Sequence, residues 1–179
     1  MADENRLYVV VSGPPASGKS TLAPAVAARL GLPLVAKDTI KDALLSTLAC
    51  DDVEASRQIG RAAVATMFAV AADAPRGAVV ESNFYRTVAP AELWRLPGAV
   101  VEVFCRCDRD VAVARYRARA GSRHAGHFDL VRQPEELWND EVAEPVAGGW
   151  PVLEIDTNHP VDIDVLMREI RTAGQPRCR

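Results

Sequence analysis

The sequence lacks the features that mark membrane-spanning, secreted or disulfide-linked proteins. No apolar run in its 179 residues approaches the roughly 20 residues that a membrane helix needs. Residues 1–6 are polar and acidic, unlike a signal peptide. The four cysteines fit neither a CxxC pair nor a zinc-ligand spacing, so we expect reduced thiols. These absences predict a cytoplasmic protein that contacts no membrane.

Lysine is also scarce, so arginine carries most of the positive charge. The chain has 21 basic and 24 acidic residues and a net charge of −3. Its lysines, Lys19, Lys37 and Lys41, all lie in the first quarter of the sequence. A general nucleic-acid binder usually carries a broad basic excess. We therefore do not expect a nucleic-acid partner, although a locally basic site stays open.

Short apolar runs alternate with helical stretches along the chain, without an internal repeat or a linker. We expect strands over residues 7–12, 33–36, 78–82, 99–105 and 151–155. We expect helices over residues 18–30, 39–49, 52–73, 91–95, 108–120, 134–143 and 161–172. Apolar strands that alternate with helices predict an α/β fold, in which helices cover both faces of a parallel sheet. The length predicts a single domain over residues 1–179.

A phosphate-binding loop follows the first expected strand. The sequence matches G-x-x-x-x-G-K-[ST] at the positions Gly13, Pro14, Pro15, Ala16, Ser17, Gly18, Lys19 and Ser20, followed by Thr21. Backbone amides of such a loop, together with the helix that follows it, form an anion site. Lys19 is expected to reach the β- and γ-phosphates, and Ser20 to place a hydroxyl on Mg²⁺. The motif thus predicts ATP and Mg²⁺ as ligands.

The motif alone does not identify the reaction. A GTPase should carry N-K-x-D after a strand, and the sequence has none. A transporter-type ATPase is longer and has a signature loop between strands. The short chain and the arginine-rich helix after the fourth strand favour a kinase with a lid.

Five segments make the sequence resemble a known family. They are SGPPASGKST, KDTIKDALL, ESNFYR, CDRDVAVARYRARAGSR and EIDTNHPVD. The chain is similar to small P-loop kinases of the nucleoside-monophosphate-kinase type, AAA-type ATP-binding kinases that include chloramphenicol phosphotransferase-like proteins, zeta-toxin-like kinases and polynucleotide kinase domains. The resemblance implies a three-layer α/β/α fold with a five-stranded sheet in the order 2-3-1-4-5. It also implies transfer of the ATP γ-phosphate to a hydroxyl.

Asp38 is the expected catalytic base and substrate contact. It lies just past the second strand, at the carboxyl edge where ligands bind, and the resemblance implies that it accepts the proton of the attacking hydroxyl. The alternative role is a helix N-cap. However, Thr39 to Asp42 fits the capping box [ST]-x-x-[DE], which would leave Asp38 free. Lys37 and Lys41 either meet an anionic substrate or are solvated.

Glu81 ends the third apolar run, at a Walker-B-like position. An acid there orders Mg²⁺ waters or the substrate, and the alternative is a surface charge at a strand end. Asn83 and Arg86 follow in the same loop, and we expect them to contact the acceptor.

An arginine-rich lid is expected over residues 118–130. Arg115, Arg119 and Arg123 recur at i, i+4 and i+8, so they share a helix face if the helix extends that far. Guanidinium groups suit phosphate oxygens and developing transition-state charge. We expect at least one of the three to be catalytic. His124 and His127 lie in the same segment, and surface positions are expected for both in preference to substrate contacts.

Two further sites are expected: a loop that contacts the nucleotide base and a wall of the acceptor pocket. Thr157 and Asn158 follow the fifth strand, and the resemblance implies that this loop lies along the adenine. The acceptor pocket is expected to use residues 49–73, which are mostly Ala, Val and Met and predict an apolar wall.

The sequence therefore predicts an ATP- and Mg²⁺-dependent kinase acting on a small-molecule hydroxyl. An antibiotic, sugar or nucleoside-like acceptor is the first expectation, and a 5′-hydroxyl polynucleotide is the second. A slow ATPase module of a larger assembly is the alternative from another class. The sequence leaves open whether the chain is a monomer or a homodimer.

Overall fold

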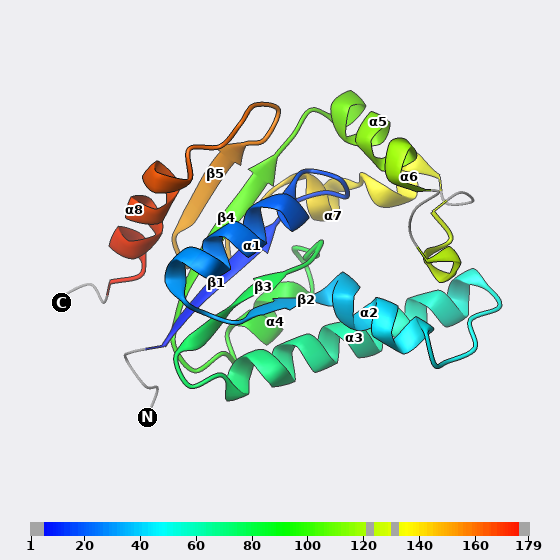
Figure 1. Cartoon of the computed structure of the whole chain (residues 1–179), viewed down its shortest axis with the longest axis horizontal. Coiled ribbons are helices and arrows are strands. Elements are labelled where there is room, and N and C mark those ends of the chain that lie inside the picture. Colours follow the sequence, from blue (N-terminus) through cyan, green and yellow to red (C-terminus); the bar gives the residue numbers. More distant parts are fainter. Residues whose placement is uncertain (1–5, 121–123, 130–132, 176–179) are drawn as a thin grey trace.

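The computed structural model describes residues 6–120, 124–129 and 133–175, which form one parallel sheet between layers of helices (Figure 1). The strands, in chain order, are β1 (Leu7–Ser12), β2 (Leu34–Ala36), β3 (Gly77–Glu81), β4 (Ala99–Arg106) and β5 (Val152–Asp156). The helices are α1 (Lys19–Leu30), α2 (Lys37–Leu45), α3 (Val53–Asp73), α4 (Ala89–Leu93), α5 (Arg109–Ala120), the 3₁₀ helix η1 (Ala125–His127), α6 (Pro134–Leu137), α7 (Asp140–Ala143) and α8 (Ile163–Ala173).

The sheet has the order β2-β3-β1-β4-β5, with every neighbouring pair parallel. This confirms the predicted order 2-3-1-4-5. The chain leaves β1 for β2 on one side of it, whereas β4 and β5 lie on its other side. The strand order therefore reverses at β1. Open α/β sheets bind their ligands at such a switch point, beyond the carboxyl ends of the strands. The order therefore places the loop after β1 where a ligand is expected.

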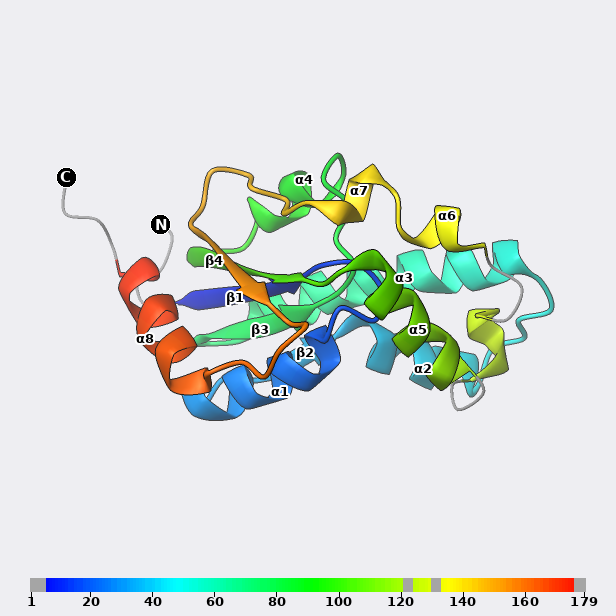
Figure 2. The same ribbon diagram turned by 90° about the horizontal axis from the view of Figure 1, so that it is seen from above.

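Alternating residues of β1 face two different hydrophobic cores. Val9 and Val11 pack with the apolar sides of α1 and α8. Tyr8 and Val10 pack with residues of α3 and α4. Figure 2 shows α1 and α8 on one side of the sheet and α4 and α7 on the other. Both faces of the sheet are thus covered, which explains why its strands are apolar on both sides.

Two helix predictions need correction. The helix expected over residues 134–143 is two short helices, α6 and α7, because the Asn139 side chain accepts a hydrogen bond from the Glu141 amide and caps a new helix. The helix expected from Thr39 begins at Lys37, and its N-cap residue Ala36 supplies no side-chain bond. Among the helices within the described ranges, none has the length and apolar character needed to cross a membrane.

Candidate active site

The loop between β1 and α1 has a backbone that only a few residue types adopt easily. Gly13 and Gly18 have φ angles of 135° and 93°, and Ala16 has a φ of 60°. A Cβ at Gly13 would lie 2.7 Å from the carbonyl oxygen of Cys105, so no larger residue fits there. Gly18 is the N-cap of α1 and offers no side-chain cap. The first amides of α1 therefore remain available to an anion at this helix N-terminus.

Lys19 brings a buried positive charge to the loop. Its Nζ donates a hydrogen bond to the Pro14 carbonyl oxygen at 2.7 Å, and its side chain is nearly inaccessible to solvent. Burial lowers the pKa of Lys19, while Glu81, Cys105 and Asp38 oppose that shift. Burial also raises the pKa of the Cys105 thiol, to about 12, so the sulfur beneath the loop is an unreactive core group.

Thr157 contacts the phosphate loop, and Asn158 contacts the segment that precedes α5. The Thr157 hydroxyl oxygen lies 2.7 Å from the Ser17 carbonyl oxygen. The Asn158 side-chain oxygen accepts a hydrogen bond from the Asp108 amide at 3.1 Å. These contacts tie the end of β5 to the phosphate loop and to the start of α5. A contact of either residue with adenine stays a prediction.

Asp38 lies across the pocket from the loop. It is in the first turn of α2 and lines the same pocket as Lys19 and Ser20. Its Oδ1 accepts a hydrogen bond from Lys37 Nζ at 2.9 Å. The capping box predicted for Thr39 is wrong, because α2 begins two residues earlier. Asp38 does not act as the N-cap either, because that position belongs to Ala36.

Glu81 ends β3 directly beside β1, opposite Val11 in the strand pairing. Its side chain is buried, so the alternative of a surface charge is wrong. Burial raises the pKa of Glu81, and the nearby Lys19 ammonium opposes that shift. Asn83 lines the same pocket. Arg86 is exposed and is absent from the described lining, and its amide donates to the Glu141 carbonyl oxygen at 3.1 Å.

The two described lid arginines have different surroundings. Arg119 lines the pocket, and its guanidinium lies over the Tyr116 ring, 5.6 Å from the centroid. Arg115 instead donates from both terminal nitrogens to the Thr157 carbonyl oxygen, each at 3.1 Å. Arg123 lies outside the described residues. Of the two lid arginines that the structure describes, Arg119 is therefore the one that lines the site.

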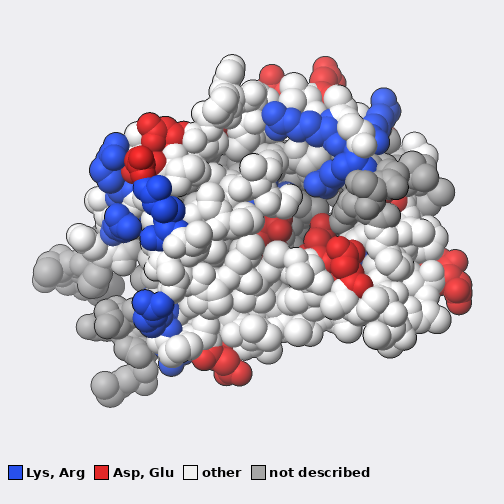
Figure 3. Space-filling view, viewed as in Figure 1, with Lys and Arg blue, Asp and Glu red and all other residues white. Residues whose placement is uncertain are grey.

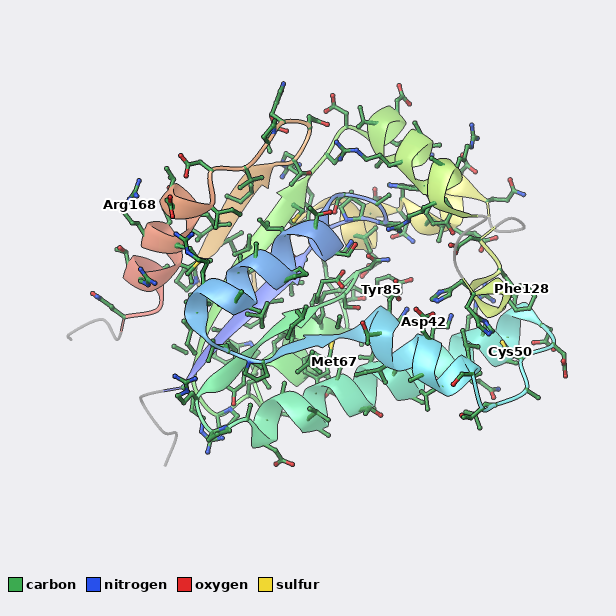
Figure 4. The ribbon with its side chains drawn as sticks, viewed as in Figure 1. Asp42, Cys50, Met67, Tyr85, Phe128 and Arg168 are labelled. Carbon is green, nitrogen blue, oxygen red and sulfur yellow. The ribbon has the colours of Figure 1, made fainter. Side chains whose placement is uncertain are left out.

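The segment around η1 packs against α2 and α3 beside the pocket, and sequence reasoning missed this contact. His127 is buried, and its Nε2 lies 2.6 Å from Asp42 Oδ1. The Ser56 hydroxyl donates to the Gly126 carbonyl oxygen at 2.6 Å and accepts from Lys41 at 2.7 Å. Figure 4 shows Asp42 on α2 at the side facing η1. The expectation of a surface His127 is wrong, and the alternative of a solvated Lys41 is excluded, since both side chains are buried.

The pocket is polar, whereas an apolar wall from residues 49–73 was expected. Its described lining contains no residue of α3, because the apolar face of that helix packs on the sheet. The lining residues are Pro15, Ala16, Gly18, Lys19, Ser20, Lys37, Asp38, Lys41, Glu81, Asn83, Tyr116, Arg119, His127, Asp129 and Leu137. Figure 3 shows acidic and basic side chains around a hollow near the centre of the view, below the position of α5 in Figure 1.

Fold and site together define the class of the protein. A parallel sheet in the order 2-3-1-4-5, a phosphate loop after β1 and an arginine-bearing helix after β4 make it a P-loop kinase-type protein of the nucleoside-monophosphate-kinase class. The chain belongs to the AAA domain family, whose model matches residues 9–143. No curated protein matches the sequence significantly.

Solved structures agree with this class. A protein from Chloroflexus aurantiacus with a provisional assignment as a kinase is 28% identical, with a TM-score of 0.82 over 94% of this chain and 98% of its own. Shikimate kinase from Acinetobacter baumannii, solved with shikimate, is 16% identical, with a TM-score of 0.62 over 94% and 93%. A gluconokinase from Sinorhizobium meliloti is 18% identical, with a TM-score of 0.55 over 95% and 94%. At the two lower identities the likeness shows the fold.

Proposed function

We propose that the protein is an ATP- and Mg²⁺-dependent kinase that phosphorylates a hydroxyl of a small, polar, polyhydroxylated molecule. The observation that carries this proposal is that Asp38, Lys19 and Ser20 line one pocket. A carboxylate thus faces a phosphate loop across a space with room for a reacting hydroxyl. Phosphoryl transfer depends mainly on positioning and on neutralising charge, and this arrangement supplies both.

The phosphate end of the pocket suits a nucleotide with its metal. The loop amides and Lys19 would hold the β- and γ-phosphates. No cluster of three or more metal-type side chains occurs in the described part of the chain. This fits Mg²⁺, which usually keeps several waters and is bound by one or two protein ligands together with phosphate oxygens. Ser20 would be the direct ligand and Glu81 would hold a metal-bound water. When bound, Mg²⁺ neutralises charge on the transferring group.

The acceptor end of the pocket supplies the general base and the positive charge that stabilises the transferred group. Asp38 takes the proton of the acceptor hydroxyl, whose oxygen bonds to the γ-phosphorus as the bond from that phosphorus to the ADP oxygen breaks. Arg119 stabilises charge on the transferred group. Closure by the η1 segment excludes water, which would otherwise accept the phosphoryl group.

The lining selects the class of acceptor. Donor groups of Lys37, Lys41 and Asn83 face the same space as acceptor groups of Asp38 and Asp129. Such a mixture can exchange hydrogen bonds with several hydroxyls of one small molecule, whereas an extended apolar ring offers no donors or acceptors to it. The named relatives that phosphorylate shikimate or gluconate share this fold, and both of those acceptors are polyhydroxylated. Within the sequence-based expectations, a sugar-like acceptor is therefore preferred to an aromatic antibiotic.

The test is phosphate transfer from Mg-ATP, followed by ³¹P NMR. Acceptors are sugars, sugar acids, cyclic polyols, aromatic antibiotics, nucleosides and a 5′-hydroxyl oligonucleotide. We expect a phosphomonoester on a polyol. We expect Asp38→Asn to lower kcat about 100-fold or more, the usual contribution of a general base, with the Kd for Mg-ATP unchanged. Glu92→Gln, at an exposed carboxylate paired with Arg95, is the control.

Three results would contradict parts of this proposal. Full activity of Asp38→Asn would show that Asp38 is not the base. ATP hydrolysis without any acceptor, unchanged in the variant, would favour the slow ATPase module. Transfer to the oligonucleotide alone would replace the polyol acceptor with a polynucleotide.

A further inference from the structure

A fully buried carboxylate lies in the middle of β4, away from the pocket. Glu102 has no exposed surface, yet it carries an ionisable group within an apolar strand. Its Oε1 accepts hydrogen bonds from the Ser12 hydroxyl at 2.6 Å and from the Val146 amide at 2.8 Å. Its Oε2 accepts from the Ala147 amide at 2.9 Å and from the Trp150 indole nitrogen at 3.1 Å. Each oxygen thus has two donors.

Four donors are what a buried carboxylate needs. Burying such a group is costly unless its lone pairs are hydrogen-bonded, and two donors on each oxygen saturate them. Three of the donors come from residues 146–150, the turn that leads into β5. Ala147 in that turn has a left-handed φ of 51°. The hydrogen bond from its backbone amide to the Glu102 carboxylate supports this conformation. One side chain therefore fixes this turn and Ser12 at the same time.

Ser12 connects this carboxylate to the phosphate loop. It is the last residue of β1 and directly precedes Gly13. Gly13 packs closely against β4, since a Cβ built there would lie 2.7 Å from the Cys105 carbonyl oxygen. A displacement of the last residue of β1 would therefore displace the phosphate loop as well. Misplacement by about 1 Å in a preorganised site can slow a reaction about 100-fold.

We propose that Glu102 is a positioning residue for the phosphate loop, which it holds in its nucleotide-binding geometry through the Ser12 hydroxyl. This inference rests on the proposed function. The competing explanation is that Glu102 only stabilises the fold. The two differ in one respect: only positioning makes the Ser12 bond more important for nucleotide affinity than the other bonds to the same carboxylate.

A matched pair of variants separates the two explanations. Ser12→Ala removes the donor next to the loop, and Trp150→Phe removes the indole donor on the opposite side of the same carboxylate. Each removes one hydrogen bond, so both should lower Tm. We expect Ser12→Ala to raise the Kd for Mg-ATP about tenfold, in line with the effect of small displacements in a binding site. We expect Trp150→Phe to stay within twofold of wild type, and Ser12→Thr, which keeps the hydroxyl, to bind normally.

The measurement is calorimetric titration with Mg-ATP and no acceptor, with Tm determined on the same samples. Wild-type affinity in Ser12→Ala would overturn the proposal, and so would equal weakening by Ser12→Ala and Trp150→Phe. The result is independent of the acceptor. A wild type that binds Mg-ATP but transfers no phosphate contradicts the proposed kinase and leaves this titration decisive. A wild type that binds no nucleotide overturns both.

Discussion

The Thr157 hydroxyl joins the end of β5 to the phosphate loop. Its oxygen lies 2.7 Å from the Ser17 carbonyl oxygen and 2.8 Å from the Arg106 carbonyl oxygen, so two carbonyls share one hydroxyl hydrogen. The Thr157 amide also donates to the Arg106 carbonyl oxygen, at 2.9 Å. The Arg106 carbonyl thus keeps a hydrogen-bond donor even without the Thr157 hydroxyl. The Ser17 carbonyl, in the loop itself, depends more on that hydroxyl.

We predict that Thr157→Val lowers stability and weakens nucleotide binding together. Valine keeps the shape of the side chain but leaves the buried Ser17 carbonyl without this donor, which costs about 1–3 kcal/mol. Thermal unfolding should show a Tm lower by several degrees, and titration a higher Kd for Mg-ATP. Thr157→Ser, which retains the hydroxyl, is the control. An unchanged Kd in Thr157→Val would mean that the loop keeps its geometry without this bond.

Arg119 and Arg115 should have separable roles although they lie one turn apart on α5. Arg119 lines the pocket, so Arg119→Ala should lower kcat by roughly 10³-fold, the scale of an arginine acting on a transferring phosphoryl group. Arg115 bonds to the Thr157 carbonyl, so Arg115→Ala should raise the KM for ATP and leave kcat nearly unchanged. Steady-state kinetics on both variants makes the comparison.

Arg117→Ala is the control for both changes, since Arg117 is exposed on the same helix. It should behave like wild type. A large loss of kcat in Arg115→Ala with a normal Arg119→Ala would reverse the assignment of the catalytic lid arginine.

The sheet and the phosphate loop were predictable because their signals are local. Eight consecutive residues from Gly13 define the loop, and apolar runs of the right length define the strands. The sheet order came from the family resemblance that those motifs carry. The boundary of α2 was not predictable from the Thr39 capping pattern, because that helix begins at Lys37 without any side-chain cap.

The parts of the site that depend on distant residues were missed. His127 meets Asp42 across 85 positions, and no periodicity in the sequence encodes that contact. Glu102 did carry a signal: a lone acid inside the apolar run AVVEVFC predicts a buried carboxylate that must find donors. Those donors, at residues 146–150, are identifiable only once β5 is placed beside β4.

The pH dependence of transfer should report on Glu81. Burial raises the pKa of this carboxyl, so it holds its proton at pH values where an exposed glutamate has already lost it. In the proposed mechanism, the ionised form holds a metal-bound water. As pH falls, activity should therefore disappear at a higher pH than ordinary glutamate titration would give. The measurement is the pH profile of kcat/KM at a fixed, low Mg²⁺ concentration.

Magnesium ions should shift that profile in one direction only. A bound cation favours the ionised carboxylate, so raising the Mg²⁺ concentration should move the acid limb to lower pH. Glu81→Gln cannot titrate, so it should lose this limb and require more Mg²⁺ at every pH. Glu92→Gln, at an exposed carboxylate on α4, should keep both the limb and its dependence on Mg²⁺. An acid limb that ignores Mg²⁺, or that survives in Glu81→Gln, would assign the titration to another group and remove Glu81 from the metal site.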